Sequence, residues 1–181
     1  FTPRFDFANK TCLAAGEIAA GYFADRASLV IETKGAQDWV SEADKNVETF
    51  IRGRIADAWP NDGIIGEEHD NESGTSGFDW VIDPIDGTTN FVNGIPAWTI
   101  VLAGVQNNQT ELGVIHDPNF KETFAATRGH GATLNGSAMR VTKGIGLDSG
   151  TVSVGYSNRV EAAHVIPVIA DLISRGALYH R

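Results

Sequence analysis

Apolar residues recur at helical spacing in three stretches of the chain. Side chains three and four positions apart share one face of a helix, so each stretch predicts an amphipathic helix. The second stretch opens on Ser41, with Asp44 three positions later, which is the spacing of a helix-capping pair. The predicted helices are residues 5–26 (Leu13, Ile18 and Tyr22 on one face), 41–60 (Val47, Phe50, Ile51 and Ile55) and 160–174, where Pro167 is a potential kink.

Short runs rich in Val, Ile and Thr predict strands. Three of these runs follow one another, separated by Asn107-Asn108 and by residues 117–119, which indicates antiparallel strands joined by turns. Helices first, then a strand meander, then a strand and a helix favour an α+β layered sandwich over a βαβ repeat. We find no linker, so residues 1–181 are expected to belong to a single domain. The predicted strands are residues 29–31, 64–65, 80–82, 97–105, 111–116, 122–126 and 151–154.

Composition narrows the function classes. Hydrophobic residues make up 42% of the 181 residues and charged residues 20%, which is typical of a globular protein. The formal net charge is −9 and there is no Lys/Arg run, so neither a nucleic acid nor a membrane surface is expected as a partner. An anionic small molecule remains compatible if metal cations intervene. The single cysteine, Cys12, is expected to be a buried apolar residue in a reducing, cytoplasmic setting.

The stretch WVIDPIDGTTNF, residues 80–91, carries the candidate chemistry. Asp83 ends an apolar run, Pro84 is expected to stop the strand, and Asp86 follows in a turn. Two converging carboxylates repel each other unless a cation or a proton lies between them, and Glu67 could reach the same point. Hard oxygen ligands without Cys or His favour Mg²⁺ over zinc or copper.

The residues after Asp86 predict a phosphate-binding helix start. If a short helix begins there, the backbone amides of Gly87, Thr88 and Thr89 lack partners within it, and such amides bind phosphate oxygens. The alternative is a capped turn, in which Asp86 caps the helix and Asp83 pairs with a surface lysine.

Several motifs together resemble the inositol monophosphatase family of lithium-sensitive, Mg²⁺-dependent phosphatases. The resemblance rests on Gly-Glu-Glu at residues 66–68 and on DPIDGTTNF at residues 83–91, and it extends through residues 38–44, 113–118 and 129–136. It implies the layered αβαβ sandwich of the sugar phosphatases, and hydrolysis of a small phosphate monoester, first of all inositol monophosphate, by a homodimer. Related enzymes act on histidinol phosphate, fructose-1,6-bisphosphate or a 3′-phosphonucleotide.

The resemblance also implies roles for individual residues. Glu67, Asp83 and the Ile85 carbonyl would bind one of two or three Mg²⁺ ions, and Asp83 would bridge to a second ion held also by Asp86. Substrate phosphate would be bound by Asp86, Gly87, Thr88 and Thr89. The attacking water would be activated at the Glu67 metal site and oriented by the Thr88 hydroxyl, backed by Asp44.

One family element has no counterpart here. The family carries a later Trp-Asp motif whose aspartate completes the second metal site, whereas Asp117, Asp148 and Asp171 of this chain lie in unlike contexts. We therefore expect the C-terminal layers of the fold to be absent. The rival hypothesis is a metal- or phosphate-binding module without turnover. Two further expectations are that Glu68 supports the metal ligands by hydrogen bonding and that His116 is a hydrogen-bonded residue, not a ligand.

Overall fold

The computed structural model describes residues 3–35, 38–144, 146–147, 149–155 and 160–180. The chain divides into two compact units, Phe1–Met139 and Arg140–Arg181. Among the described residues, no helix has both the length and the apolar character that crossing a membrane requires.

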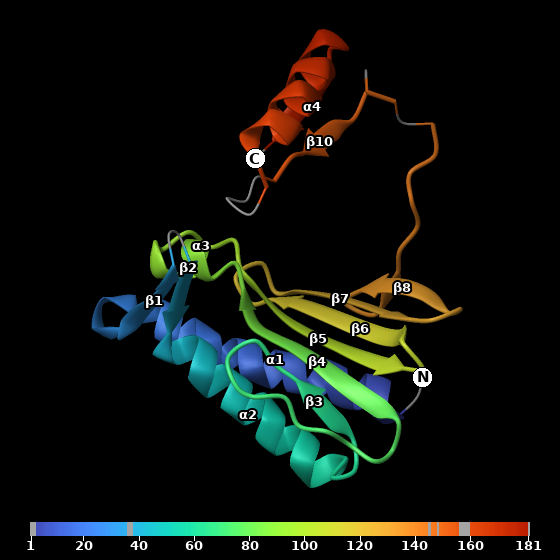
Figure 1. The fold of residues 1–181 in the computed structure, drawn as a ribbon. Helices are drawn as coiled ribbons and strands as arrows, with labels where there is room; N and C mark the ends of the chain where they lie inside the picture. Colours follow the sequence, from blue (N-terminus) through green and yellow to red (C-terminus); the bar gives the residue numbers. More distant parts are fainter. Residues whose placement is uncertain (1–2, 36–37, 145, 148, 156–159, 181) are drawn as a thin grey trace. The chain divides into compact units, whose positions relative to one another are not determined.

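A seven-stranded sheet forms the centre of the first unit (Figure 1). Its strands are neighbours in chain order, and all pairs are antiparallel except the first, in which β3 and β4 run parallel. The predicted meander is confirmed, while the last two strands were not predicted. The strands are β3 (Gly63–Ile65), β4 (Phe78–Asp86), β5 (Thr99–Gln106), β6 (Gln109–Asp117), β7 (Glu122–Thr127), β8 (Gly131–Leu134) and β9 (Ser137–Ala138).

Two long helices cover one face of this sheet (Figure 1). They are α1 (Pro3–Ala24), which is followed by a 3₁₀ turn at Arg26–Ser28, and α2 (Glu42–Ala58). Helix α1 presents small side chains to the sheet, so its backbone lies close to β5 and β6. These buried small residues are Ala8, Cys12, Ala15, Gly16 and Ala19.

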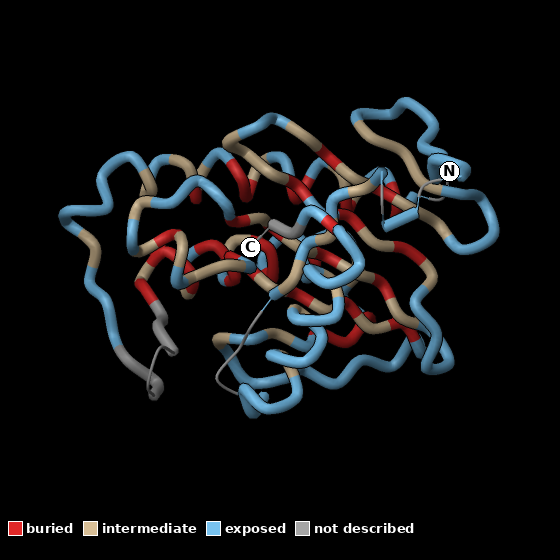
Figure 2. The backbone as a smooth tube through the Cα atoms, turned by 90° about the horizontal axis from the view of Figure 1, so that it is seen from above, coloured by how far each residue is buried: buried red, intermediate tan, exposed pale blue. Residues whose placement is uncertain are grey.

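The core lies between the helices and the sheet. Buried and less buried positions alternate along β4 and β5 (Figure 2), as expected for strands with one face against a hydrophobic layer. The largest buried side chains are aromatic, Trp80, Trp98 and Phe91.

Two strands precede α2 and form a separate hairpin. They are β1 (Ile31–Gly35) and β2 (Asp38–Ser41), and they pair antiparallel. The sequence predicted only a short strand at residues 29–31, because the residues that follow are polar and carry no alternating apolar pattern. The hairpin ends at Ser41, which is the N-cap of α2.

The prediction that Pro84 stops the strand is wrong, because Pro84 lies within β4. The strand continues to Asp86, with Asp83 opposite Val101 and Asp86 opposite Thr99. Two residues of β4 therefore face one residue of β5, which is a β-bulge. Pro84 lies in this bulge, where its missing N–H group costs no ladder hydrogen bond.

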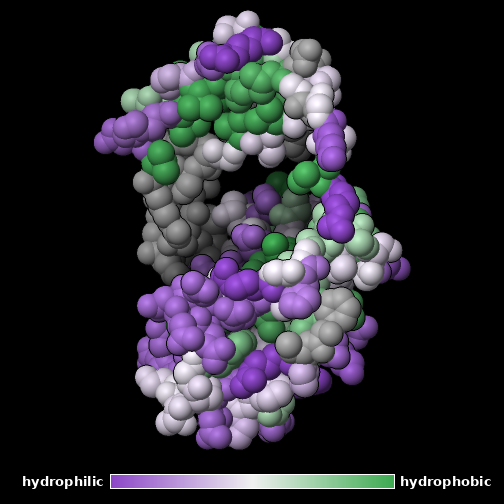
Figure 3. Space-filling view, turned by 90° about the vertical axis from the view of Figure 1, so that its right-hand side faces the viewer, coloured by the Kyte–Doolittle hydropathy of each residue, from purple (hydrophilic) through white to green (hydrophobic). Residues whose placement is uncertain are grey.

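The second unit is a small βαβ element. Strands β10 (Thr151–Ser153) and β11 (Leu178–His180) pair in parallel, and α4 (Ala162–Ser174) connects them. The predicted third helix is confirmed and contains Pro167. The exposed apolar side chains of α4 include Ile166 and Ile173. Figure 3 shows a hydrophobic area on the surface of this unit.

Candidate active site

Asp83 lies at the bulge of β4, and one of its carboxylate oxygens, Oδ1, is buried without a hydrogen-bond partner among the described residues. Burial, which is the largest cause, and the negative charges of Glu67, Asp86 and Asp44 together raise the pKa of this carboxyl to about 8. A carboxylate that is buried among like charges is destabilised unless a cation or a proton compensates it.

Asp44 connects α2 to the residues that follow the bulge. Its Oδ2 atom accepts hydrogen bonds from the backbone N–H (2.9 Å) and the hydroxyl (2.6 Å) of Ser41, so the expected link between these two residues exists. Its Oδ1 atom lies 3.2 Å from the Thr88 hydroxyl, which is also 3.0 Å from the Ile85 carbonyl. Burial raises the pKa of Asp44, and the bonds from Ser41 and Thr88 partly offset this shift.

A short helix, α3 (Thr88–Val92), begins directly after Gly87. Gly87 has a φ of 99°, and a Cβ atom there would lie 2.9 Å from the Ala97 carbonyl oxygen, so the turn requires glycine. Asn90 donates a 2.7 Å hydrogen bond to the same carbonyl, and Phe91 packs against Trp98 with ring centroids 4.9 Å apart. These contacts attach the start of α3 to the beginning of β5.

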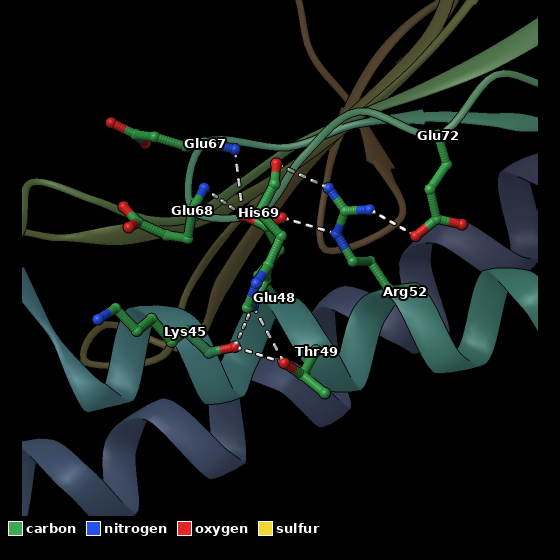
Figure 4. A network of polar contacts seen from close by, with 8 residues as sticks. All are labelled: Lys45, Glu48, Thr49, Arg52, Glu67, Glu68, His69 and Glu72. Atoms are coloured by element: carbon green, nitrogen blue, oxygen red, sulfur yellow. Dashed lines mark hydrogen bonds and ion pairs between the residues drawn. The ribbon is translucent and has the colours of Figure 1, made fainter.

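Glu67 lies in a segment without regular secondary structure after β3. The backbone N–H groups of Glu67 and Glu68 donate hydrogen bonds of 3.1 and 2.8 Å to Oε2 of Glu48 on α2 (Figure 4). Arg52 donates a 2.7 Å bond to Oε1 of the same carboxylate. Glu48 and Arg52 were not predicted as site residues, although two charged residues four positions apart within the apolar stripe of a helix were an available signal.

The donor set suits a hard cation, although no closed cage exists. Within the described ranges, no group of three or more His, Cys, Asp or Glu side chains is close enough to form a ready metal site. The carboxylates nevertheless act on one another, since Glu67 and Asp86 shift the pKa of Asp83, and a cation or a proton at the unpartnered Asp83 oxygen would relieve this repulsion. All available donors are oxygens, which is the ligand type that Mg²⁺ prefers.

Most of the residues selected from the sequence lie near one another in the first unit. Asp44, Glu67 and Asp86 all act on Asp83, while Thr88 contacts Asp44 and the Ile85 carbonyl. Gly87 and Thr89 are the N-cap and the second residue of α3.

The later aspartates are engaged elsewhere. Asp117 accepts hydrogen bonds from the backbone of Asn119 and Phe120 in a turn, and Asp171 pairs with Arg175. Asp148 lies outside the described residues. His116 is buried and its Nδ1 is 2.9 Å from the Thr123 hydroxyl, so the expectation of a hydrogen-bonded histidine is confirmed.

Residues 2–172 match the sequence profile of the inositol monophosphatase family. The chain belongs to this family. The expected resemblance is thereby confirmed.

Two curated relatives illustrate the range of the family. A histidinol-phosphatase of Chlorobaculum parvum is 39% identical over 141 residues, which cover 78% of this chain and 54% of the relative. An inositol-1-monophosphatase of Rhizobium meliloti is 35% identical over 173 residues, which cover 90% of this chain and 65% of the relative. The chain therefore spans just over half to about two thirds of the length of these relatives.

Solved structures confirm the fold. The extragenic suppressor protein SuhB of Bartonella henselae aligns with a TM-score of 0.94 and 26% identity over 99% of this chain and 70% of its own. An IMPase/NADP phosphatase complexed with Mg²⁺ and phosphate aligns with a TM-score of 0.74 and 26% identity over 93% of this chain and 64% of its own. The mixed α+β arrangement predicted from the sequence is correct.

Proposed function

We propose that this protein is a Mg²⁺-dependent phosphatase that hydrolyses a small phosphate monoester at the carboxylates around Asp83. The observation that carries the proposal is the buried, unpartnered Asp83 oxygen, whose carboxyl group experiences the charges of Glu67 and Asp86. Membership of the family supports phosphate-ester hydrolysis in general. The related phosphatase complexed with Mg²⁺ and phosphate supports the choice of cation.

The proposed metal ligands are Glu67, Asp83, Asp86 and the carbonyl of Ile85. Glu67 and Asp83 would hold one ion together with that carbonyl, and Asp83 would bridge to a second ion held also by Asp86. When bound, Mg²⁺ supplies positive charge for the phosphoryl oxygens and makes a nearby water more acidic. Glu67 thus contributes to catalysis as a ligand.

The proposed catalytic pair is Thr88 and Asp44. The Thr88 hydroxyl is 3.2 Å from Asp44 Oδ1, and Ser41 occupies the other Asp44 oxygen, so Oδ1 is the carboxylate oxygen left to accept the hydroxyl proton. This arrangement suits orientation of a water for in-line attack on phosphorus, which needs no covalent enzyme intermediate.

Two groups are proposed to contact the phosphate. Asp86 would do so through the second metal ion, and the backbone at the start of α3 would do so directly. The first amides of a helix have no partner within it, and here they belong to Gly87, Thr88 and Thr89. Gly87 has a positive φ, which lets the chain turn sharply. The helix-start amides therefore come directly after the carboxylates of Asp83 and Asp86 in the chain.

Inositol monophosphate is the substrate we propose first, with histidinol phosphate as the alternative. The former agrees with the family match and the Rhizobium meliloti relative, the latter with the Chlorobaculum parvum relative. The test measures phosphate release by the full-length protein from both compounds, from fructose-1,6-bisphosphate and from a 3′-phosphonucleotide, with and without Mg²⁺ and Li⁺. Release that is independent of Mg²⁺, or no release from any of them, would reject the proposed function.

A further inference from the structure

The segment that carries Glu67 is attached to α2 by side chains, not by a strand ladder. Residues 66–72, which we name the 66–72 loop, follow β3 and return to it at Glu72, whose backbone exchanges two 2.8 Å hydrogen bonds with Ile64. Between these ends the loop has no regular secondary structure. Its position therefore depends on what its backbone and side chains contact.

Glu48 is the first of these contacts. Its carboxylate is fully buried, with 0% of the residue exposed, and one oxygen accepts the N–H groups of both Glu67 and Glu68. Figure 4 shows that the side chains of Glu67 and Glu68 extend away from Glu48. Glu48 thus holds the backbone at Glu67 and leaves the Glu67 carboxylate available to Asp83.

Arg52 is the second contact, and it connects the first to the rest of the loop. Its Nε bonds Glu48, one terminal nitrogen bonds Glu72 at 2.8 Å, and the other donates to the His69 carbonyl at 3.2 Å. One guanidinium group therefore joins α2 to both the middle and the end of the loop (Figure 4). Its planar fork of donors makes this possible, whereas a lysine ammonium has no such fixed geometry.

Gly66 shows how closely the loop approaches this pair. A Cβ atom at Gly66 would collide with Oε1 of Glu48 and would lie 2.6 Å from a terminal nitrogen of Arg52. The loop therefore lies directly on the charged pair, and a movement of Glu48 would displace the backbone that carries Glu67.

We infer that Glu48 and Arg52 are positioning residues that set the place of the Glu67 carboxylate for metal binding, an inference that rests on the proposed function. Residues that orient metal ligands by hydrogen bonding commonly change metal affinity by ~10–100-fold when they are replaced. Glu48 is the acceptor of two adjacent loop amides. Replacing it should therefore weaken Mg²⁺ binding more than it lowers the turnover rate at saturating Mg²⁺.

The test uses the full-length protein with Glu48→Gln and, as a second variant, Arg52→Lys. The glutamine is the same size, but its one oxygen can accept either from the two loop amides or from Arg52, and its –NH2 group then faces the other set of donors. Mg²⁺ binding is measured by calorimetry, and hydrogen exchange of the 66–72 loop is measured without Mg²⁺. We expect ~10–100-fold weaker Mg²⁺ binding in Glu48→Gln, a smaller loss in Arg52→Lys, and faster exchange in the loop with unchanged exchange in β5.

The matched control is Asp62→Asn. Asp62 is also a buried carboxylate paired with an arginine, Arg4, and it accepts further bonds from Ser76 and Trp80, and these three partners lie outside the loop. Asp62→Asn should lower the unfolding temperature while Mg²⁺ affinity stays at the wild-type value.

The outcomes separate the two proposals. Mg²⁺ affinity within twofold of wild type in both folded variants, or an equal loss in Asp62→Asn, would overturn the positioning role and leave the proposed function standing. No Mg²⁺ binding by the wild-type protein would reject the proposed function, and the positioning role with it. If Glu48→Gln does not fold, Arg52→Lys decides by the same two measurements.

Discussion

At the scale of single residues, the candidate site is a place where the fold tolerates unfavourable electrostatics. A buried polar atom without a hydrogen bond costs ~1–3 kcal/mol, and Asp83 combines this cost with the repulsion of neighbouring carboxylates. Its neighbour in the sequence, Pro84, lies in the bulge between Asp83 and Asp86. Groups with strongly perturbed pKa values concentrate at functional sites.

Asp83→Asn tests the role of this residue. We expect Mg²⁺-dependent phosphate release to be lost, because a proposed metal ligand is removed, while the metal-free protein unfolds at a higher temperature, by ~2–4 °C if repulsion of ~1 kcal/mol is relieved. The measurements are a phosphate assay and thermal unfolding with and without Mg²⁺. Asp79→Asn, on the same strand but away from the site, serves as the control. Near-normal release by Asp83→Asn would remove Asp83 from the metal site.

Gly87→Ala tests the turn before α3. Gly129 provides the matched control, because both glycines have positive φ but a Cβ atom at Gly129 meets nothing within 4 Å. Both changes should cost the ~1–2 kcal/mol of a left-handed conformation, and Gly87→Ala should cost more, because its Cβ approaches the Ala97 carbonyl. Urea denaturation gives the two free energies of unfolding. Equal losses would show that the close approach to Ala97 is unimportant.

At the scale of elements, hydrophobic patterns predicted the helices and strands that are indicated by their own sequence. They did not predict the features that depend on contact with a neighbouring strand. The meander from β5 to β7 was predicted because its strands are rich in Val, Ile and Thr and its turns carry Asn, Asp and Pro. Strand β8 was not predicted, because Gly131–Leu134 pairs with β7 through backbone contacts that no apolar alternation indicates. The length of β4 was underestimated because a bulge at Pro84 depends on the neighbouring strand β5.

The packing of α1 on the sheet makes an element-scale prediction. A Cβ atom at Gly16 would lie 2.5 Å from Cδ2 of His116, whose ring is held by Thr123, so Gly16→Ala should force α1 away from β6 and cost ~1–3 kcal/mol.

Gly53→Ala on α2 is the control for Gly16→Ala. It adds a Cβ atom with nothing within 4 Å, at an exposed helix position, and should therefore stabilise the protein by ~0.5–1 kcal/mol through helix propensity alone. Denaturation of both variants measures the free energies of unfolding. A gain in stability for Gly16→Ala would show that α1 can move at no cost.

At the scale of the whole molecule, the residues of the candidate site come from distant parts of the chain. The DPIDGTTNF motif was sufficient to select Asp83, Asp86 and Thr88, because its members are close in sequence. Glu48 and Arg52 could not be selected in this way, because their role follows from the contact of α2 with a loop about 20 residues further on. Sequence patterns therefore predicted the residues proposed for chemistry better than those that support them.

Acid stability is a second property of the whole molecule, and it depends on His116 between α1 and the sheet. Burial lowers the pKa of His116 below its ordinary value of 6.5, although Asp117 and Glu17 act in the opposite direction. Below pH 6.5 the unfolded chain therefore binds more protons than the folded one at this position, so stability falls as pH falls, by at most ~1.4 kcal/mol per pH unit.

His116→Gln should flatten this part of the stability profile, because glutamine fills a similar volume without titrating. The measurement is the free energy of unfolding in urea at several pH values from 6.5 downward, and the slope should decrease relative to wild type even if the variant is less stable throughout. His130→Gln, at an exposed histidine in the turn before β8, should leave the slope unchanged. An unchanged slope in His116→Gln would mean that this buried ring does not account for the loss of stability in acid. Carboxyl groups such as Asp62 would then account for it instead. The hydrogen bonds from Arg4 and Ser76 lower the pKa of Asp62, although burial acts in the opposite direction.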